Sequence, residues 1–240
     1  GCYRDHIDPA YRERAPHVVH HESMGDIYLV DGMKTPVPMG LIAAAGIAPQ
    51  DIRIGGAKFE DLHRSGWDPS TRLQDQDKDG IAAEIIYPTV GMLICNHPDF
   101  DFKKACFDAY NRWLQGYCAY APDRLVGMGQ TAMRTVKEGI ADLERIKAMG
   151  FRGVMMPGNP GEKDYDDPAF DAFWEAAVAL EAKSLTEPLQ IGRDNGAKRA
   201  LIPIENKRQF LEVSADIVEH VDPVFYGDPR AASLKALNLS

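Results

Sequence analysis

The chain has 240 residues, of which 45% are hydrophobic and 26% are charged, so it is long enough for one large domain or for one medium and one small domain. These values exclude disorder, collagen and coiled coil as descriptions of the whole chain. Its net charge of −9 and its pI of about 5.3 argue against a nucleic-acid partner, which would need a basic face.

No apolar run approaches the roughly 18 residues that a membrane span needs, and we recognise no signal peptide. The four cysteines form no CxxC pair, which suits reduced thiols. We therefore expect a cytoplasmic protein without a membrane partner. The chain begins at Gly1 rather than at a methionine, which suggests processing or a missing natural start.

Residues 1–66 are expected to form an irregular N-terminal insertion with a hairpin. Residues 26–32 look like a strand that enters a tight hairpin, because Asp31-Gly32 supplies the positive φ of such a turn. His17, His20 and His21 have the spacing of a metal pair on a helix, but Val18-Val19 favours a strand, on which these side chains would not converge.

Residues 67–182 are predicted to alternate strand and helix three times. Each predicted strand is a nearly continuous apolar run, which indicates a parallel sheet covered by helices on both faces. The fold class is therefore α/β, and three βα units are too few for a closed eight-stranded barrel. Asp68-Pro69, Thr135 with Glu138, and Asp167-Pro168 are helix start signals. The expected strands are residues 81–87, 124–130 and 151–156, and the expected helices include 68–80, 101–120 and 135–150.

Residues 183–240 show a different succession of predicted helices and strands, which indicates a small α/β subdomain. We expect helices over 186–195 and 215–220, a last helix that starts at Asp228-Pro229, and strands over 198–203 and 221–226.

Polar side chains follow all three predicted strands of the parallel sheet. Tyr87 and Thr89 follow the first strand, Gln130 ends the second, and Asn159 follows the third. Because chemistry in a parallel α/β sheet lies at the carboxyl ends of the strands, these four residues are predicted to line a substrate pocket. The alternative is that the Pro and Gly residues around them merely turn the chain.

Other candidate residues have simpler explanations. His97 could be a ligand, but we favour a solvated loop histidine. Residues 75–80 resemble a calcium loop that lacks its final glutamate, and we favour a charged helix face. Cys95, Cys106 and Cys118 are expected to be buried thiols rather than nucleophiles, since no basic residue stands beside them.

Seven motifs carry a family resemblance across residues 1–181. They lie at residues 8–16, 67–73, 79–89, 110–114, 122–125, 150–157 and 167–170, and Asp79-Gly80-Ile81-Ala82-Ala83-Glu84-Ile85-Ile86-Tyr87-Pro88-Thr89 is the longest. Together they resemble the amidohydrolase-related family, which includes metal-dependent hydrolases and non-oxidative decarboxylases of the aminocarboxymuconate-semialdehyde type. The resemblance implies strands two to four of a TIM barrel, a zinc or manganese cofactor, and a small carboxylated or cyclic substrate.

The chain departs from that family at its metal ligands. The family's opening strand, with its Asp-x-His or His-x-His pair, is not in the sequence. Where the family has a later strand that carries a metal-binding histidine, this chain has Glu181-Ala182-Lys183-Ser184. The catalytic aspartate that the family has near its end is missing too. No ligand is carried over to any residue, so we expect no bound metal and an inactive fragment that is open to self-association through exposed strand edges.

The tail resembles another family over residues 184–240. Residues 184–190 and 194–208 resemble the end of a Lon-type protease domain, in particular that of the Lon-related protein of BREX phage-defence systems. The serine of the Ser–Lys dyad is not in the sequence and Pro188 stands at the lysine position, so a non-proteolytic module is expected. The combination of two families predicts a chimera with a junction near residue 182.

Overall fold

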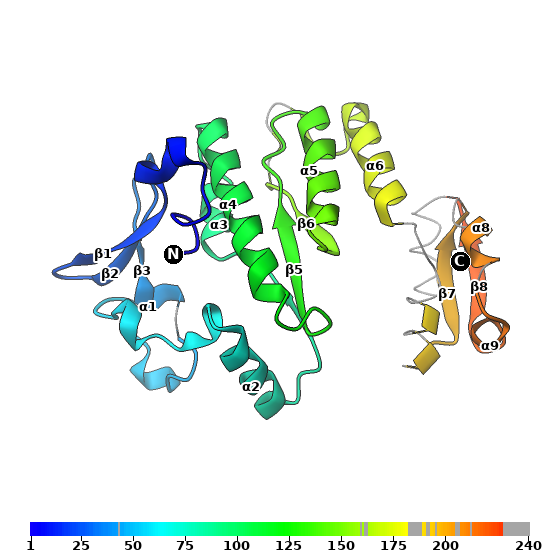
Figure 1. Cartoon of the computed structure of the whole chain (residues 1–240), viewed down its shortest axis with the longest axis horizontal. Coiled ribbons are helices and arrows are strands. Elements are labelled where there is room, and N and C mark those ends of the chain that lie inside the picture. Colours follow the sequence, from blue (N-terminus) through cyan, green and yellow to red (C-terminus); the bar gives the residue numbers. More distant parts are fainter. Residues whose placement is uncertain are drawn as a thin grey trace. The chain divides into compact units, whose positions relative to one another are not determined.

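The computed structural model describes the chain except for residues 43, 159, 161–162, 182–188, 191–192, 195, 205–206, 212 and 228–240 (Figure 1). The chain divides into two compact units, residues 1–173 and residues 174–240. None of the described helices is both long and apolar enough to cross a membrane.

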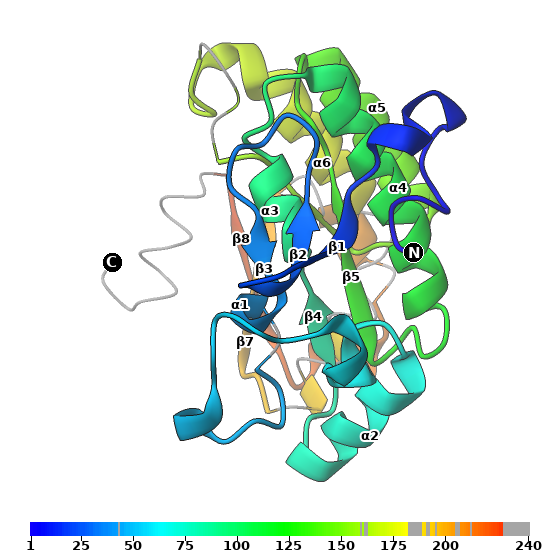
Figure 2. The same ribbon diagram turned by 90° about the vertical axis from the view of Figure 1, so that its left-hand side faces the viewer.

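A three-stranded antiparallel sheet forms within the N-terminal region. Its strands are β1 (His17–His21), β2 (Gly25–Leu29) and β3 (Val37–Pro38), with β2 in the centre. The strand expected around Val18-Val19 is therefore confirmed. Figure 2 shows this sheet in front of β5 and α4.

The tight hairpin predicted at Asp31-Gly32 is wrong, because residues 30–36 make a longer connection between β2 and β3. Gly32 does have a positive φ of 77°. A Cβ on Gly32 would lie 2.7 Å from Nε2 of His97, so the glycine lets this loop pack closely against His97.

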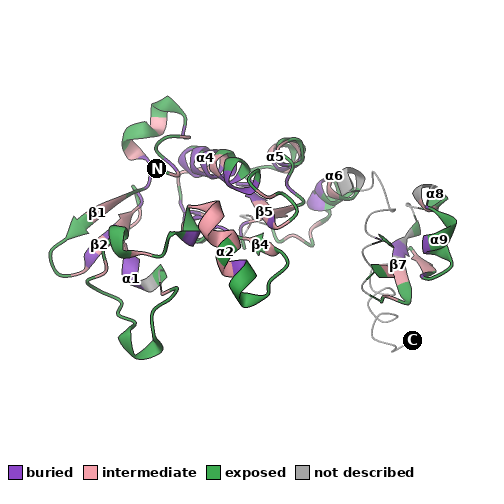
Figure 3. Cartoon of the chain, turned by 60° about the horizontal axis from the view of Figure 1, so that its bottom comes forward, coloured by how far each residue is buried: buried purple, intermediate pink, exposed green. Residues whose placement is uncertain are grey.

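The segment between β3 and the second sheet holds only short elements: α1 (Met39–Ile42) and the 3-10 helices Pro49–Asp51, Phe59–Asp61 and Arg64–Gly66. Another 3-10 helix, Pro9–Arg14, precedes β1. Residues 44–64 are almost entirely exposed or half-exposed (Figure 3). The described residues of this part contain only short 3-10 helices.

The second sheet confirms three parallel strands. β4 (Glu84–Ile86), β5 (Leu125–Gln130) and β6 (Gly153–Met155) lie in the order β4-β5-β6, with Glu84 opposite Leu125 and Met128 opposite Gly153. β4 begins later than the predicted residue 81. The carbonyls of Ile81 and Ala82 accept hydrogen bonds from the Arg124 guanidinium at 3.0 Å, instead of joining the ladder.

The helices around this sheet begin where their capping residues predict. α2 (Pro69–Asp79) has Asp68 as its N-cap and Gly80 as its left-handed C-cap. The Thr135 hydroxyl caps α5 (Val136–Ala148) by accepting from Glu138 N at 3.1 Å. The other helices of this region are α3 (Val90–Ile94), α4 (Phe100–Cys118), the 3-10 helix Pro168–Phe170, and α6 (Asp171–Glu181).

The main core lies between α4, β5 and the N-terminal segment. Tyr3 joins this core, with its ring 6.4 Å from those of Tyr28 and Tyr110. Gly127 of β5 allows α4 to approach the strand, because a Cβ there would lie 2.9 Å from Leu114 Cδ2. The fully buried members of this core include Ile94, Phe102, Cys106, Ala109 and Leu114.

The second unit has a two-stranded parallel sheet and a small core of its own. β7 (Arg199–Pro203) pairs with β8 (Asp222–Tyr226), and α8 (Lys207–Phe210) and α9 (Ala215–Val218) lie between them in the chain. The predicted helices over 186–195 and after Asp228 fall partly or wholly outside the described residues. The Lon-type resemblance and the junction near residue 182 stay predictions. The core residues are Leu189, Ile202, Val213, Ile217 and Val221.

Candidate functional site at the carboxyl edge of the parallel sheet

The four predicted pocket residues do not form one group. Tyr87 is 56% exposed and Thr89 is also exposed, whereas Gln130 is 1% exposed. Asn159 lies outside the described residues. Within the described chain, no hydrogen bond joins Gln130 to Tyr87 or Thr89, so Gln130 is the one predicted residue that is buried at this edge.

The backbone of Gln130 is held firmly, while its side chain is not paired. Gln130 N donates to Asn111 Oδ1 at 2.8 Å, and Asn111 Nδ2 donates to Gln130 O at 2.9 Å. Both Nε2 and Oε1 of Gln130 are buried without a hydrogen-bond partner among the described residues. A Cβ on Gly91, in the first turn of α3, would lie 2.3 Å from Oε1. A buried amide without partners is costly and is typical of a group that meets a water or a ligand.

The loop after β5 is fixed by a buried polar cluster. The Thr131 hydroxyl donates to Asp142 Oδ2 at 2.6 Å and accepts from Met133 N at 3.3 Å. Asp142, whose side chain is 2% exposed, also binds Lys104 Nζ at 3.1 Å and the Arg145 guanidinium. Met133, two residues after Thr131, has a positive backbone φ of 53°. This left-handed conformation is uncommon for a residue other than glycine, and strained residues of this kind cluster at active sites and ligand sites.

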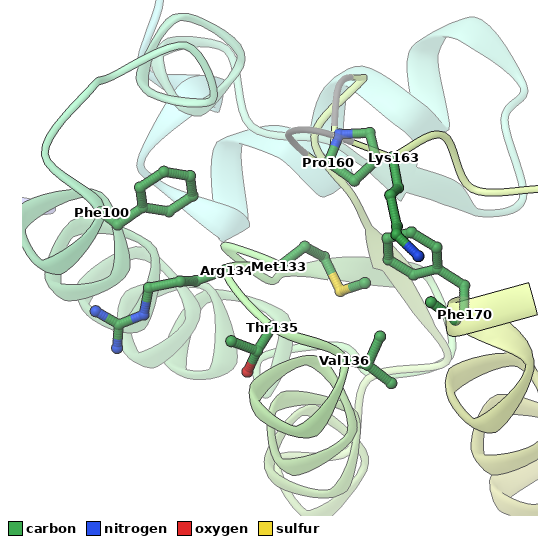
Figure 4. A pocket seen from close by; sticks show the side chains of 9 residues that line it. Phe100, Met133, Arg134, Thr135, Val136, Pro160, Lys163 and Phe170 are labelled. Atoms are coloured by element: carbon green, nitrogen blue, oxygen red, sulfur yellow. The ribbon is translucent and has the colours of Figure 1, made fainter. Parts of the chain in front are cut away.

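A cavity of about 370 Å³ opens beside this strained residue (Figure 4). It lies at the amino ends of α4 and α5 and of the 3-10 helix before α6, which is the carboxyl side of the sheet. We did not predict it, although its residues follow the predicted strands, because sequence alone does not show which loop side chains enclose a space. Its apolar wall includes Phe100, Met133, Val136 and Phe170.

The same cavity is lined by two cationic residues. Arg134 binds Asp101 and both carboxylate oxygens of Glu138, and its guanidinium points away from the cavity. Hydrogen bonding to Asp101, then to Glu138, raises the pKa of Arg134. Lys163 Nζ lies 3.2 Å from Asp167 Oδ1, and Figure 4 shows the ammonium group directed toward the cavity beside the Phe170 ring.

Asp167 is held in its charged form. The Ala169 N–H donates to Asp167 Oδ1 at 2.8 Å. This hydrogen bond, followed by that from Lys163, lowers the pKa of Asp167. The carboxylate therefore acts as the cap of the 3-10 helix at Pro168–Phe170.

The prediction of a solvated His97 is wrong. His97 is 3% exposed, and its Nε2 lies 2.7 Å from the Asp31 carbonyl oxygen. Its Nδ1 accepts from Asp99 N at 3.1 Å, which assigns the proton to Nε2. The partner Asp31 is 66 positions away, so local sequence gave no sign of this contact.

The cysteines of α4 and the one that follows α3 are poor nucleophiles. Cys106 and Cys118 are buried, as predicted, and Cys95 is half-buried. Burial raises the pKa of Cys106 to about 12 and that of Cys118 to about 11. Burial also raises the pKa of Cys95, against the opposing effect of Lys103. Thiolates at neutral pH are therefore disfavoured at all three positions.

The other charged candidates are surface pairs. His20 Nδ1 lies 2.8 Å from Asp26 Oδ1 and His21 Nδ1 accepts from Ser23 N, so the β1 histidines do not converge. Asp75 pairs with His63 at 2.6 Å on the exposed face of α2, as expected for a charged helix face. Among the described residues, no group of three or more His, Cys, Asp or Glu is arranged to hold a metal ion.

Known proteins resemble this chain over part or most of its length. The sequence pattern of the amidohydrolase family matches residues 60–183. The 2-amino-3-carboxymuconate-6-semialdehyde decarboxylase of Dictyostelium discoideum is 26% identical over 151 residues, which cover 60% of this chain and 40% of that protein. The chain thus spans less than half the length of this curated relative.

Two solved structures are similar to parts or most of the chain. The 5-carboxyvanillate decarboxylase of Novosphingobium aromaticivorans, solved with bound manganese, is 25% identical, covers 46% of this chain and 32% of its own, and has a TM-score of 0.41. An amidohydrolase of Mycobacterium avium subsp. paratuberculosis is 12% identical, covers 98% of this chain and 82% of its own, and has a TM-score of 0.52. The second likeness concerns the fold alone.

Proposed function

Because this chain belongs to the amidohydrolase family, we propose that it is part of a metal-dependent hydrolase or decarboxylase for a small carboxylated or cyclic substrate, and that residues 1–240 alone do not turn over such a substrate. The observation that carries this proposal is the β4-β5-β6 sheet, with a buried unpaired amide and a cavity at its carboxyl edge. In parallel α/β folds, that edge is where substrates bind.

The described residues at this edge do not fit a divalent metal. Catalytic zinc takes histidine, cysteine or carboxylate ligands, and manganese prefers carboxylate, carbonyl and water oxygens. The strand ends instead present Tyr87, Thr89 and the amide of Gln130, and the described chain contains no cluster of three metal-ligand side chains. The chemistry of these side chains supports the proposal that residues 1–240 alone hold no catalytic metal.

The roles that these residues can have are binding and positioning. The Gln130 amide carries donors and an acceptor that are unused in the described chain, and its backbone is fixed by Asn111. Such an amide can fix the orientation of a carboxylic acid or hydroxyl group without moving a proton. We propose that Gln130 positions a substrate, and we propose no general acid or base in residues 1–240.

The test compares residues 1–240 with a longer protein that also contains the residues encoded by the adjoining DNA. Each protein is incubated with Zn²⁺ or Mn²⁺, desalted, and measured for bound metal and for release of CO₂ from 2,6-dihydroxybenzoate and related acids. We expect neither stoichiometric metal nor CO₂ from residues 1–240. One tightly bound metal per chain together with turnover would contradict inactivity. If the extended protein holds a metal but turns over no carboxylic acid, amide or ester, the proposed activity is wrong.

A further inference from the structure

We propose that the outer edge of β1 binds the same edge of a second copy of this chain, so that two antiparallel sheets join into one continuous sheet across a two-fold axis at Val19. This inference goes beyond the proposed function, because it uses no residue at the carboxyl edge of the parallel sheet. It concerns the first unit alone, since β1, β2 and β3 all lie within residues 1–173.

The outer edge of β1 presents backbone groups that no described strand uses. β1 lies at the margin of its sheet, with β2 on one side. Asp26 N donates to the Ala57 carbonyl at 2.8 Å and not to His20, which is its partner in the register. Because hydrogen-bonded and non-hydrogen-bonded pairs alternate in an antiparallel ladder, the N–H and C=O groups of Val18 and His20 point away from β2. No described residue makes a backbone hydrogen bond with these outward groups.

The sequence of β1 does not protect this edge. Proteins usually prevent edge pairing with a lysine, a proline or a bulge in the edge strand. β1 reads His-Val-Val-His-His, and its register with β2 is unbroken over residues 17–21. Val18 and Val19 are only half-buried, and the histidines are exposed. In Figure 1 the turn that joins β1 to β2 lies far from α4 and β5. An accessible edge of β-branched residues without such protection favours a partner strand.

One two-fold register pairs both outward residues of each copy. With Val19 opposite Val19 of the second copy, Val18 lies opposite His20 of that copy, and the two exchange N–H···O bonds in both directions. A register centred on Val18 would place His20 opposite Pro16, which has no N–H to donate. A register centred on His20 would place Val18 opposite Glu22, which lies beyond the end of β1. The edge is therefore complementary to itself in the register centred on Val19.

The side chains match across the same register. Val19 lies opposite Ile27 of β2, so the two copies together form a continuous apolar row on one face of the joined sheet. Ile27 is 4% exposed while Val19 is only half-buried, so pairing would cover the apolar side chain that the edge leaves open. The exposed Glu22 of one copy would lie opposite Pro16 of the other, beside the 3-10 helix whose last turn carries the exposed Arg12. Opposite charges thus meet at both ends of the interface.

The first experiment cross-links cysteine variants of the full chain with diamide. Val19→Cys places two thiols at a non-hydrogen-bonded pair with Cα atoms about 4.5 Å apart, within reach of a disulfide, so we expect covalent dimers. His21→Cys is the control, because its two copies would lie roughly 14 Å apart along the strands and should not cross-link. A mixture of His17→Cys and His21→Cys proteins of different mass should give mixed dimers, since these residues lie opposite each other in the register. The wild type reports any background from Cys2 and Cys95.

The second experiment measures dimerisation without a cross-link. In sedimentation velocity, the wild type should show a dimer whose share rises with protein concentration. Val18→Pro removes an outward N–H and no hydrogen bond to β2, and it should weaken dimerisation about thirtyfold, because symmetry removes two backbone hydrogen bonds. Near-ultraviolet circular dichroism reports whether this variant folds, and the cross-linking decides alone if it does not.

Three results would overturn the proposal. The wild type could stay monomeric at its highest soluble concentration, Val19→Cys and His21→Cys could cross-link alike, or a folded Val18→Pro could dimerise as the wild type does. None of these outcomes bears on metal binding or turnover.

Discussion

Gln76 and Gln130 are both 1% exposed, yet they lie at opposite ends of the same parallel sheet. At the amino end, Gln76 Nε2 donates to Glu84 Oε2 at 2.7 Å, and Arg72 binds both oxygens of Glu84 at 2.6 and 3.1 Å. At the carboxyl end, both Nε2 and Oε1 of Gln130 lack a partner in the described chain, whereas at the amino end only Oε1 of Gln76 lacks one. The comparison indicates that the amino end stabilises the fold, whereas the carboxyl end contains an unpaired amide at the place where we propose that a substrate binds.

The largest expected change in stability comes from removing the Glu84 carboxylate at the amino end of the sheet. Glu84→Leu would leave the Arg72 guanidinium and the Gln76 amide without their shared acceptor. We expect a loss of about 2 kcal/mol in the free energy of unfolding, below the value for fully buried pairs because Arg72 and Glu84 are partly exposed. Urea unfolding followed by tryptophan fluorescence measures the loss. Glu144→Leu, at an exposed position of α5, is the control and should change stability by less than about 0.5 kcal/mol.

The two glutamines themselves allow a matched exchange. Gln76→Met removes the hydrogen bond to Glu84 and should destabilise the chain by about 1.5 kcal/mol. Gln130→Met removes two unpaired polar atoms with little change of shape, so we expect no loss or a gain of about 0.5 kcal/mol. Equal losses in the two variants would contradict the difference between the ends of the sheet. Urea unfolding under identical conditions decides between these outcomes.

A smaller effect is expected where α3 meets Gln130. Gly91→Ala places a Cβ against the Gln130 amide, whose end can move only by disturbing the core, so we expect a loss of about 1 kcal/mol. The loss should shrink when Gln130 is already alanine. A double-mutant cycle measures this coupling, and a coupling energy of zero would show that the two groups do not constrain each other.

The smallest effect is a pH dependence at the amino end. Burial raises the pKa of Glu84, but hydrogen bonds from Arg72 and Gln76 outweigh burial and lower it below its ordinary value of 4.5. A carboxyl group with a lowered folded pKa stabilises the fold above its unfolded pKa, and this contribution disappears as the pH falls through the folded pKa. The stability difference between the wild type and Glu84→Gln should therefore be constant from pH 7 to 5 and decrease below pH 4.5. A difference that grows in acid would contradict the assigned shift.

The sequence predicted the elements whose signals are local. Asp68, Thr135 and Gly80 mark helix ends through contacts with residues three or four positions away, and the apolar runs predicted three parallel strands. The site was less predictable. Gln130 stood out as a polar residue at a strand end, but the space that its amide occupies depends on Gly91, which is 39 positions earlier in the chain.

The burial of His97 and the cavity beside Met133 were not predicted for the same physical reason. His97 meets Asp31, and Lys163 shares a cavity with Phe100, only after distant segments have packed together. A histidine or lysine in a loop has the same local pattern whether it is solvated or enclosed. Contacts of this kind are set by tertiary packing, which neither spacing nor composition encodes.

The ion pairs of Arg14, which lie beside the buried His97, have a consequence for shortening the protein at its amino end. Arg14 binds Asp31 Oδ2 at 2.6 Å and Asp99 Oδ2 at 3.0 Å, beside the contact of His97 with Asp31. Asp99 is also the N-cap of α4, and Phe100 follows it. Shortening the gene from its 5′ end past codon 14 would therefore loosen the start of α4, and with it one wall of the cavity, although the deleted residues are far from that wall in the chain. Proteolysis of such a shortened protein should begin near residue 99. An unchanged digestion pattern would show that the ion pairs of Arg14 with Asp31 and Asp99 are not needed to hold the start of α4.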